Sequence, residues 1–392
     1  MKNNNEIFVI RYKRTPIGNF LSNLSSLSAE HLASSLIEEL CIDINKKDIN
    51  RVYIGNVLSS GLGQNIAKQI GFNNGVDAPS ITLNRVCSSG IQSIIEGYKS
   101  ILLKESDLVL VGGTESMSKS PYLLDKLRNG NKFGNTNLLD SMVYDGLTDA
   151  YSGNHMGELT ENIIERYNLT RSELDNYSKM SYERARKAYT ENKFINEIVN
   201  IEIKNKNGII VINEDEEVNK ITNLDKLDNL RPVFGKNGKL TAGNSSKLSD
   251  GACLLLLASR EYVIKNNIKP IAKIIDYDLS VGHPSDFSIV PIKSIQRILE
   301  KNNFTTNDID YFEINEAFAN VPVLASKELS IEYEKINIFG GAIAMGHPLG
   351  CSGARIVATL LSVLQDKKGK IGIASICNGG GGATSLLIEN LI

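Results

Sequence analysis

The segment NRVCSSGIQSIIEGYKSILLKESDLVLVGG, residues 84–113, decides the fold. It opens with small residues around Cys87, continues with helical spacing over Ile91–Leu103, and ends in the apolar run Asp107–Val111 before Gly112 and Gly113. A strand that is apolar on both faces is typical of a parallel or mixed sheet between helices. The segment therefore predicts one α/β unit.

The second half of the chain echoes this unit. Gly350-Cys351-Ser352-Gly353 resembles Cys87-Ser88-Ser89-Gly90, and it opens a predicted helix over Ala354–Leu364. That helix leads to a predicted strand, Lys370–Ile376, and to glycines after Cys377. The echo suggests two copies of one α/β unit that face each other, with an insertion between them.

The segments outside the two copies differ in character. We expect strands over Ile7–Arg11 and Arg51–Val57, and helices over Ser28–Leu40, with a cap at Ser28, and over Asn65–Phe72. Residues 119–247 are more polar, irregular near 129–137, and carry the acidic run Glu214–Glu217. A charge run is most simply a solvated surface loop, and we predict one here.

Composition excludes several classes of protein. The 392 residues are 42% apolar and 22% charged, with a formal net charge of −2, so bulk charge does not indicate nucleic acid or an anionic membrane as a partner. No apolar signal region follows Met1–Asn5, and apolar runs such as Leu254–Ala258 are too short to span a bilayer. We therefore expect a cytoplasmic protein.

The five cysteines show no C-x-x-C spacing, which argues against a disulfide framework or a structural zinc site. We expect Cys41, Cys253 and Cys351 to be packing residues. Cys87 differs, because it stands where an irregular segment enters a helix. Unpaired N–H groups and the helix dipole there are expected to lower its pKa and favour the thiolate.

Three further elements carry candidate chemistry. His347 lies between glycines in Gly340–Gly353, which suits a base beside a cysteine. Cys377 ends a buried strand at the glycines 379–382, whose N–H groups suit an oxyanion hole, and the Lys-Ser/Thr of a phosphate loop is missing. Asn315 and Glu316 end the strand Tyr311–Ile314. His31, near the start of a helix, is expected to be structural.

Together, and in this order, these elements resemble the motifs of the thiolases. The resemblance spans nearly the whole chain. The matching stretches are Asn84–Gly90, Val111–Ser118, Thr241–Ser246, Ser249–Ala252, Asn315–Ala319, Gly340–Gly353 and Cys377–Gly381.

The resemblance implies an α/β protein with the five-layered α/β/α/β/α fold of two similar halves and an inserted loop domain. We expect residues 1–118 and 248–269 to form the N-terminal half, 119–247 the loop domain and 270–392 the C-terminal half.

The resemblance also implies the catalytic roles. Cys87 is the nucleophile that becomes acylated, and His347 activates it. Cys377 removes the α-proton of acetyl-CoA. Asn315 positions a water that completes a first oxyanion hole with His347, and the N–H groups of Cys87 and Gly379 form a second. Such chemistry needs an acyl-enzyme and prearranged donors for an enolate.

For the substrate, the resemblance implies a pantetheine channel lined by Ser246 and Ala317, with Leu147, His155 and Met156 nearby; Ala242 and Phe318 belong to the same motifs. Three departures stand out. Phe287–Pro291 replaces a usual glycine-containing motif and is bulkier. Lys220 stands where the short-chain branch often has an arginine near the adenine, and Ala383 replaces a common glycine.

Within the family, Asp145–Tyr151 followed by His155-Met156-Gly157 resembles the acetoacetyl-CoA branch. That implies reversible Claisen condensation of two acetyl-CoA to acetoacetyl-CoA and CoA. The alternatives are a degradative 3-ketoacyl-CoA thiolase of broader chain length and a non-catalytic acyl-CoA binding or lipid-transfer relative. The resemblance implies CoA as substrate and product, no permanent cofactor and no metal. It also implies a homotetramer or homodimer, with the loop near Lys119–Asp140 as the tetramer contact.

Overall fold

The computed structural model describes residues 6–206 and 208–392. Its centre is a ten-stranded sheet with the order β12-β13-β14-β11-β1-β10-β5-β3-β4, in which the short β2 pairs with β10. The strands of this sheet are β1 (Ile7–Arg14), β2 (Gly18–Asn19), β3 (Arg51–Gly55), β4 (Ser80–Leu83), β5 (Leu108–Ser116), β10 (Ser249–Ser259), β11 (Ala272–Val281), β12 (Tyr311–Ile314), β13 (Ile371–Asn378) and β14 (Gly382–Asn390).

The sheet consists of two similar halves, which we call fans, on either side of the contact between β1 and β11. At this contact only Ile7, Phe8 and Val9 of β1 pair with β11. In the first fan, β1, β10 and β5 are antiparallel neighbours, and β3 then pairs parallel to β5. In the second, β11, β14 and β13 are antiparallel, and β12 pairs parallel to β13. The repeated order confirms the two similar halves that the sequence echo predicted.

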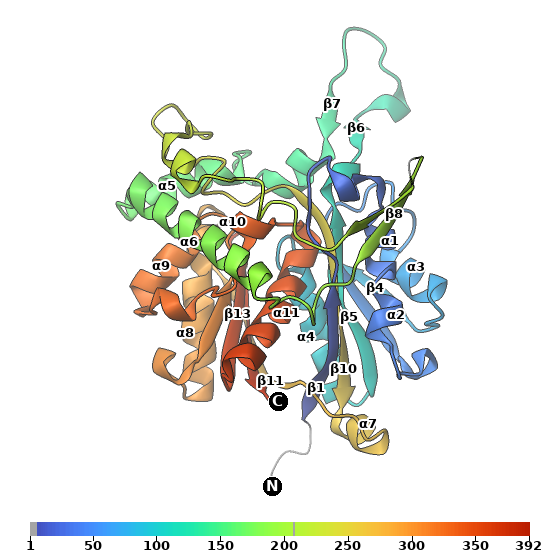
Figure 1. Ribbon diagram of the computed structural model, residues 1–392. Coiled ribbons are helices and arrows are strands. Elements are labelled where there is room, and N and C mark those ends of the chain that lie inside the picture. Colours follow the sequence, from blue (N-terminus) through green and yellow to red (C-terminus); the bar gives the residue numbers. More distant parts are fainter. Residues whose placement is uncertain (1–5, 207) are drawn as a thin grey trace.

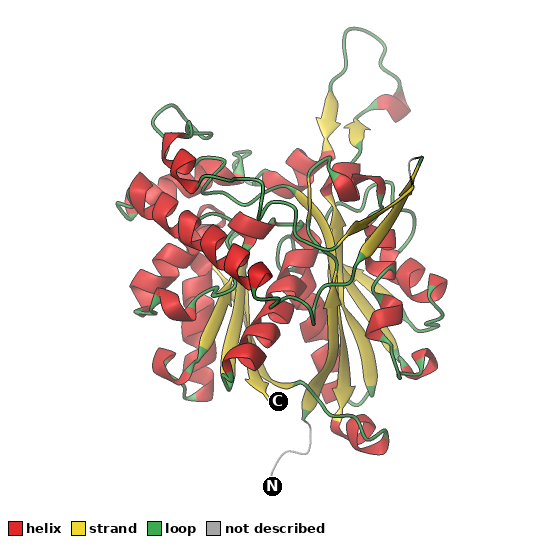
Figure 2. Ribbon diagram, viewed as in Figure 1, coloured by secondary structure: helices red, strands yellow, loops and turns green. Residues whose placement is uncertain are grey.

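Helices complete five layers (Figures 1 and 2). Helices α1 to α3 pack on the outer face of the first fan, α4 and α11 lie together between the fans, and α8 and α9 cover the second. The predicted α/β/α/β/α fold is therefore confirmed. The helices of these layers are α1 (Ala29–Ser34), α2 (Ile37–Leu40), α3 (Ile66–Asn73), α4 (Ser89–Leu102), α7 (Arg260–Lys265), α8 (Val290–Asn302), α9 (Asn320–Leu329), α10 (Ala342–Met345) and α11 (Leu349–Lys367).

Strand β10 shows why its sequence is a continuous apolar run. Cys253, Leu255 and Leu257 pack into the central helical layer, whereas Leu254 and Leu256 pack toward α1 to α3. Successive side chains of a strand point to opposite faces, so a strand covered on both faces must be apolar at every position. Full burial of each leucine contributes about 1.5–3 kcal/mol of hydrophobic free energy.

The two central helices approach closely near their N-termini. A Cβ on Gly90 would lie 2.7 Å from the backbone nitrogen of Ala354, and a Cβ on Gly353 would lie 2.5 Å from that of Ile91. Glycine is the only residue without a Cβ, so these two positions allow the backbones to meet. The paired motifs of the echo therefore face each other across one helix crossing.

Residues 119–247 add elements outside the layers. A hairpin of β6 and β7 projects away from the body, and α5 and α6 lie across the top of the second half (Figure 1). Helix α6 was not predicted, because most of its side chains are polar and only one narrow face is buried. The elements are β6 (Tyr122–Leu124), β7 (Leu138–Asp140), α5 (Met156–Arg166), α6 (Arg171–Thr190), β8 (Ile201–Asn205) and β9 (Gly208–Ile212).

The prediction of a solvated acidic loop at Glu214–Glu217 is wrong for two of its residues. Asp215 is buried and accepts two hydrogen bonds from the guanidinium of Arg14, at 2.6 and 3.0 Å. Glu217 is also buried and accepts from Asn19 Nδ2 at 3.0 Å. A buried carboxylate needs such partners. Here the partners lie near the N-terminus, far away in sequence, so no local pattern reveals them.

Predicted element ends differ by a few residues from the observed ones. The Ser28 cap is confirmed, since its side chain accepts from His31 N, but the helix predicted over Ser28–Leu40 breaks into α1 and α2. Cys41, Cys253 and Cys351 are buried, as expected of packing residues.

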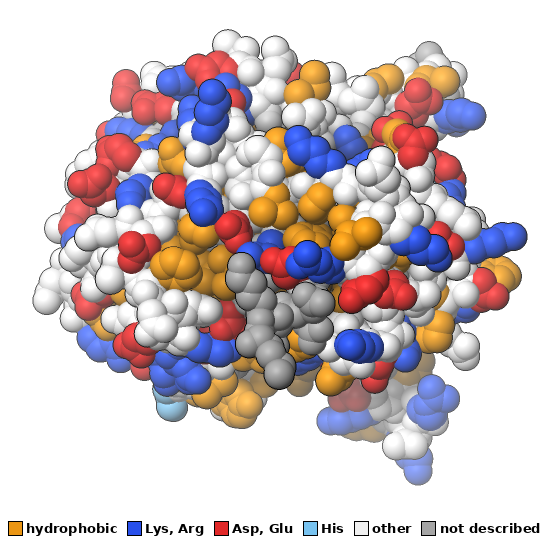
Figure 3. All heavy atoms as spheres, turned by 90° about the horizontal axis from the view of Figure 1, so that it is seen from below, with side chains coloured by type: hydrophobic (Ala, Val, Ile, Leu, Met, Phe, Trp, Pro, Cys, Tyr) orange, Lys and Arg blue, Asp and Glu red, His pale blue; other side chains and the backbone are white. Residues whose placement is uncertain are grey.

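On the described residues of the face in Figure 3, positive and negative side chains are intermixed. Among the described helices, none combines the length and the apolarity that crossing a membrane requires.

Candidate active site

The turn that leads into α4 is strained just before Cys87. Val86 has φ of +48°, a conformation that a β-branched residue rarely adopts. Local hydrogen bonds hold it: Asn84 Oδ1 accepts from Val86 N at 2.9 Å, and the Ser89 hydroxyl donates to Val86 O at 2.6 Å. Such strain is stored where a side chain must be presented in a fixed direction, and here that side chain is Cys87.

Cys87 lies against the turn that follows β13 in the other half of the molecule. The side chains of Ser88 and Asn378 are hydrogen-bonded at 2.9 Å, which ties the two turns together. The backbone N–H groups of Cys87 and Gly379 both face the Cys87 sulfur. The structure thus places two of the predicted oxyanion donors, Cys87 N–H and Gly379 N–H, beside the same atom.

The expected low pKa of Cys87 is wrong. Burial raises the pKa of its thiol to about 12, and the two backbone N–H groups only partly oppose this. The two N–H groups lower the pKa as expected, but removal of the charged form from water has the larger effect, and Glu115 adds to it. Cys87 is therefore a neutral thiol until a base removes its proton.

Cys377 stands next to Cys87 at the end of β13. Its side chain is buried, and burial raises the pKa of its thiol above the usual range, with a further rise from the charge of Cys87. The pair behaves as two thiols of which at most one can ionise easily. That arrangement allows one sulfur to bond while the other moves a proton.

His347 lies in the turn before α11, and its hydrogen bonds define its tautomer. Its Nδ1 lies 2.6 Å from Ser352 Oγ, and that hydroxyl donates to Pro348 O at 2.9 Å. Because the serine proton is used there, Nδ1 carries the imidazole proton and donates it to Ser352. Nε2 is buried without a partner among the described residues.

The environment of His347 keeps the imidazole neutral. Burial, with a smaller contribution from the nearby Arg355, lowers the pKa of His347 to about 3. A neutral imidazole with a free Nε2 is a proton acceptor, which is the form that the activation of a neutral thiol requires.

Asn315 follows β12 and is fully buried. Its backbone N–H donates to Ser375 O at 2.9 Å, and its Oδ1 faces Arg355 Nη2 at 3.5 Å. Its Nδ2 has no partner among the described residues, which is costly for a buried donor. A donor of this kind fits a bound water or a substrate oxygen.

A cavity of about 420 Å³ leads to His347, which is within the usual size of small-molecule sites. Its lining is mainly apolar, with a few polar groups, and includes six residues that the sequence singled out. Those six are Leu147, His155, Ala242, Ser246, Phe318 and His347; the others are Met117, Val233, Phe234, Thr241, Ser245, Lys247, Leu248 and Leu349. Leu349 also belongs to the apolar cluster on which Cys87 packs, so the cavity ends near the thiol.

Four predicted substrate-binding residues lie outside this lining. Met156 is beside Gly379, and Ala317 O accepts from Ser246 N at 3.0 Å. Phe287 is buried edge-on against Phe318, with ring centroids 6.4 Å apart. Lys220 is exposed and lines a separate open hollow with the acidic run at 214–216.

His155 closes one side of the cavity as part of an aromatic group. Its ring stacks on Phe234 at 4.8 Å, and its Nδ1 accepts from Gly157 N at 3.0 Å, which caps α5. Burial lowers the pKa of His155, so it presents a neutral ring to the cavity. This side of the cavity is broad, flat and apolar.

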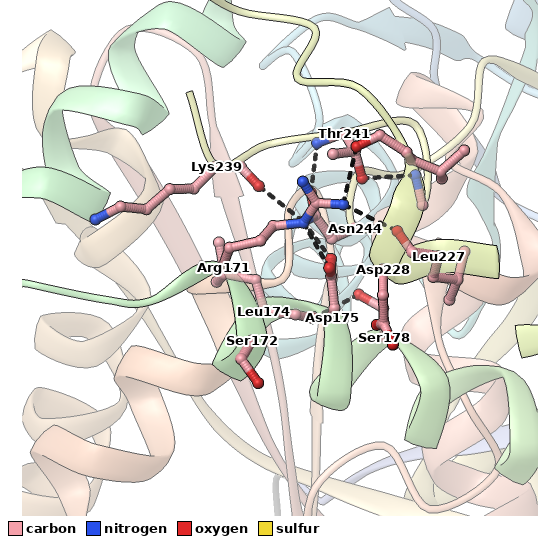
Figure 4. A network of polar contacts seen from close by, with 12 residues as sticks. Arg171, Ser172, Leu174, Asp175, Ser178, Leu227, Asp228, Lys239, Thr241 and Asn244 are labelled. Atoms are coloured by element: carbon pink, nitrogen blue, oxygen red, sulfur yellow. Dashed lines mark hydrogen bonds and ion pairs between the residues drawn. The ribbon is translucent and has the colours of Figure 1, made fainter. Parts of the chain in front are cut away.

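A polar network supports another part of the cavity wall, residues 241–246 (Figure 4). Asn244 Nδ2 donates to Asp175 Oδ1 at 2.8 Å, and Asp175 in turn accepts from Arg171 Nε at 2.5 Å. Arg171 also donates to Leu227 O at 2.9 Å. The wall is thereby attached to α6, so the loop segment has a fixed backing.

Sequence reasoning missed three residues of the site. Ser352 sets the His347 tautomer, and Arg355 faces both Asn315 and the buried Glu313, at 3.7 Å from the latter. Lys247 lines the cavity between two recognised motifs. An isolated charge in the sequence could have pointed to two of them. Lys247 is the sole charged residue of 241–249, and Arg355 is the sole charged residue of 349–365.

Two further buried acids hold the site's loops. Glu115 accepts from Gly350 N at 2.9 Å and from Val57 N at 3.0 Å, and burial raises its pKa to about 7. Glu316 accepts from Tyr177 and Ile343 N. Among the residues the structure describes, no group of three His, Cys, Asp or Glu side chains is placed to hold a metal ion.

Comparison with known proteins gives a consistent picture. Residues 7–261 match the family profile of the thiolase N-terminal domain, and residues 268–390 match that of the thiolase C-terminal domain. The chain is 42% identical to a cytosolic acetyl-CoA acetyltransferase of Gibberella zeae, over the full length of both.

Two solved structures are also similar over nearly the whole chain. A human mitochondrial 3-ketoacyl-CoA thiolase superposes with a TM-score of 0.96 at 36% identity and covers 99% of this chain and 100% of its own. Acat5 thiolase from Ascaris suum, solved with coenzyme A, superposes with a TM-score of 0.92 at 37% identity and covers 98% of this chain and 100% of its own.

Proposed function

Because this chain belongs to the thiolase family, we propose that it is an acyltransferase that condenses two acetyl-CoA molecules, reversibly, into acetoacetyl-CoA and CoA. What supports the proposal is a set of four groups, of which His347 lines the cavity, Cys377 lies beside Cys87, and Asn315 shares the neighbour Arg355 with His347. They are a thiol faced by two N–H donors, a second buried thiol, a neutral imidazole with a free Nε2, and an unpaired amide.

In the first half-reaction, Cys87 attacks the thioester of acetyl-CoA. His347 Nε2 accepts the Cys87 proton, since its Nδ1 is already bonded to Ser352. The departing CoA thiolate takes the proton of the Cys377 thiol, which leaves Cys377 as a thiolate, and the acetyl group stays on Cys87. In the next half-reaction, a water held by Asn315 Nδ2 and the imidazole of His347 stabilise the thioester oxygen of the second acetyl-CoA as its enolate forms.

In the second half-reaction, a second acetyl-CoA enters, and Cys377 removes a proton from its α-carbon. The resulting enolate attacks the carbonyl carbon of the acetyl group on Cys87. The oxygen of that carbonyl accepts hydrogen bonds from the backbone N–H groups of Cys87 and Gly379. Collapse of this intermediate breaks the Cys87–carbonyl bond and releases acetoacetyl-CoA. The released Cys87 thiolate takes its proton back from His347, Cys377 keeps the α-proton as a thiol, and the reverse sequence gives thiolysis.

The pantetheine part of CoA is proposed to bind along the cavity, between the wall at Ala242 and Ser246 and the aromatic side at His155 and Phe318. Ala317 and Met156 are proposed to contact it near the thioester, with Leu147 opposite. We propose residues 1–118 with 248–269 as the N-terminal half, residues 119–247 as the loop domain and residues 270–392 as the C-terminal half. CoA is a substrate and product here, with no permanently bound cofactor.

Lys220 is proposed to meet the phosphates of CoA as a flexible point charge. Lys220→Ala should then raise KM for CoA without changing kcat, with Lys236→Ala as an exposed control on the same segment. An unchanged KM at low ionic strength would remove this contact from the proposal.

Thiolysis across 3-ketoacyl-CoA chain lengths tests the function, from acetoacetyl-CoA to 3-ketododecanoyl-CoA. The ring of His155 fills space that a longer chain would need, and Phe287 backs Phe318, so overpacking should cost a longer chain about 1–3 kcal/mol. We expect kcat/KM to fall by about tenfold or more beyond acetoacetyl-CoA. Equal values for the longest chains would favour the degradative alternative, and no turnover at all would favour the binding relative.

For location and assembly we propose a cytoplasmic homotetramer or homodimer. One similar protein is described as cytosolic, which supports the first point. The projecting hairpin of β6 and β7 exposes Tyr122, Phe133 and Leu138, which supports a contact between copies there. Sedimentation of Phe133→Lys beside the wild type tests it, because loss of a hairpin contact should lower the assembly mass.

A further inference from the structure

The ammonium of Lys247 is enclosed on the side of the cavity that residues 241–246 form. Its Nζ donates to Ala242 O at 2.5 Å and to Ser245 O at 3.0 Å. The side chain is only 19% exposed and lines the cavity that leads to His347. One cation therefore joins two carbonyls of the same short loop, which are three residues apart in sequence.

A carboxylate and an aromatic ring complete the enclosure. Glu217 lies 3.9 Å from Nζ, and the ring of Tyr182 lies with its centroid 5.9 Å from it. Glu217 is itself held by the Tyr182 hydroxyl at 3.0 Å and by Asn19 Nδ2 at 3.0 Å. Burial lowers the pKa of Lys247 to about 8, and Glu217 opposes this. The surroundings are thus built for one positive charge.

The loop that Lys247 joins is connected to both catalytic segments. On one side, Ser246 N donates to Ala317 O and Ala319 N donates to Asn244 O, each at 3.0 Å, next to Asn315. On the other side, the backbone oxygen of Lys247 accepts from His347 N at 3.0 Å. Lys247 therefore lies at the junction of the Asn315 segment, the His347 segment and the cavity wall.

We propose that Lys247 is a positioning residue whose ammonium serves as a tethered internal cation that holds the 241–246 wall in the shape that binds the pantetheine part of CoA. This inference rests on the proposed function of the cavity. The physical reason is that two carbonyl oxygens aimed at one point repel each other, and a buried carboxylate beside them adds to this, unless a cation lies between. Without the ammonium the loop should relax and the wall should move.

The first test compares Lys247→Met, which keeps most of the volume and removes the charge, with Lys335→Met as matched control. Lys335 is also half-buried and donates to one backbone carbonyl, Ile309 O at 2.9 Å, away from the cavity. Hydrogen bonds from a charged group are strong, so Lys247→Met should raise KM for CoA thioesters by about tenfold to a hundredfold. We expect a smaller fall in kcat, weaker CoA binding by calorimetry, and no change for Lys335→Met.

The second test restores the cation. Lys247→Ala removes three methylenes and the ammonium, and propylammonium replaces the missing atoms. We expect propylammonium to lower KM of this variant in a saturable way. Neither 1-propanol, which has the shape without the charge, nor tetramethylammonium, which has the charge without N–H donors, should do so. Glu217→Gln keeps Lys247 and removes the carboxylate charge beside its ammonium. This variant should show a smaller rise in KM, and it provides the test if both Lys247 variants fail to fold.

The outcomes separate the two proposals. If the wild type makes no acetoacetyl-CoA, the proposed function fails. If the wild type is active and Lys247→Met keeps its KM and CoA affinity, the internal-cation role is overturned. Equal rescue by 1-propanol and propylammonium would also overturn it, because volume and not charge would then explain the defect. Loss of thermal stability with an unchanged KM would assign Lys247 to folding alone.

Discussion

Helices α4 and α11 cross at Gly90 and Gly353, and in each the preceding serine closes the turn that leads into the helix. Ser89 donates to Val86 O and accepts from Arg85 N, and Ser352 donates to Pro348 O and accepts from His347 Nδ1. The same turn closure therefore positions a thiol in one half and an imidazole in the other. The difference lies in the residues ahead of the helix, not in the scaffold.

The comparison also shows how burial acts on the two groups. Burial raises the pKa of Cys87 to about 12 and lowers the pKa of His347 to about 3, because the charged form is disfavoured in both cases. The result is a neutral donor in one half and a neutral acceptor in the other.

The largest expected effect divides the two thiols. Cys87→Ala should abolish condensation, a loss of about 10,000-fold or more, because no acyl-enzyme can form. Cys377, His347 and Asn315 remain, so this variant should still exchange the acetyl protons of acetyl-CoA with deuterated water, as followed by NMR. Cys377→Ala should lose that exchange while Cys87 is still acylated slowly, as followed by intact-protein mass spectrometry. Exchange at the wild-type rate in Cys377→Ala would transfer the base role to another group, with His347 first.

The next prediction tests whether Gly90 and Gly353 contribute equally to the crossing of α4 and α11. Gly90→Ala and Gly353→Ala each push a methyl group into backbone, so both should lower the free energy of unfolding by about 3 kcal/mol or more. Gly61→Ala is the control, since nothing lies within 4 Å of its Cβ and only its φ of +80° opposes it, at about 1 kcal/mol. A tolerated alanine at one crossing position alone would break the proposed symmetry of the contact. Urea titration measures all three.

A smaller effect concerns acid stability in the second half. The unfolded state binds a proton at His347 below its ordinary pKa of about 6.5, whereas the folded state does so only near 3. Stability therefore falls as pH falls through this window, and near pH 5 the loss from His347 is about 2 kcal/mol relative to pH 7. His347→Asn should lose that much less over the same interval in urea titrations. Parallel curves for the two proteins would contradict the buried neutral imidazole.

The smallest effect separates the two serines. Ser352→Ala removes the partner that fixes the His347 tautomer, so kcat should fall by about tenfold with little change in KM. Ser89→Ala removes a turn hydrogen bond and should cost about 1 kcal/mol of stability, with a smaller change in kcat. Steady-state kinetics and thermal denaturation of both variants check this, and an equal kcat loss in the two would mean that the serines act only on the turns.

The sequence alone predicted the repeat, the general fold and Cys87 as the candidate nucleophile. Local pattern sufficed for these, because a strand buried on both faces must be apolar throughout, and a helix entry must carry small residues where two backbones meet. Cys87, His347 and Cys377 could be singled out because each lies at a turn rich in small residues, and Asn315 because it ends a predicted strand. The side chains of β10 point alternately into two cores, because successive side chains of a strand lie on opposite faces.

Only the tertiary structure decided the electrostatics and the supports. The pKa of Cys87 depends on how deeply the other half of the molecule buries it, and the burial of Asp215 depends on Arg14, two hundred residues away in sequence. The tautomer of His347 and the enclosure of Lys247 likewise come from partners that local sequence does not identify. Residue type fixes what a group can do, whereas its charge state and direction depend on neighbours that only the folded chain brings together.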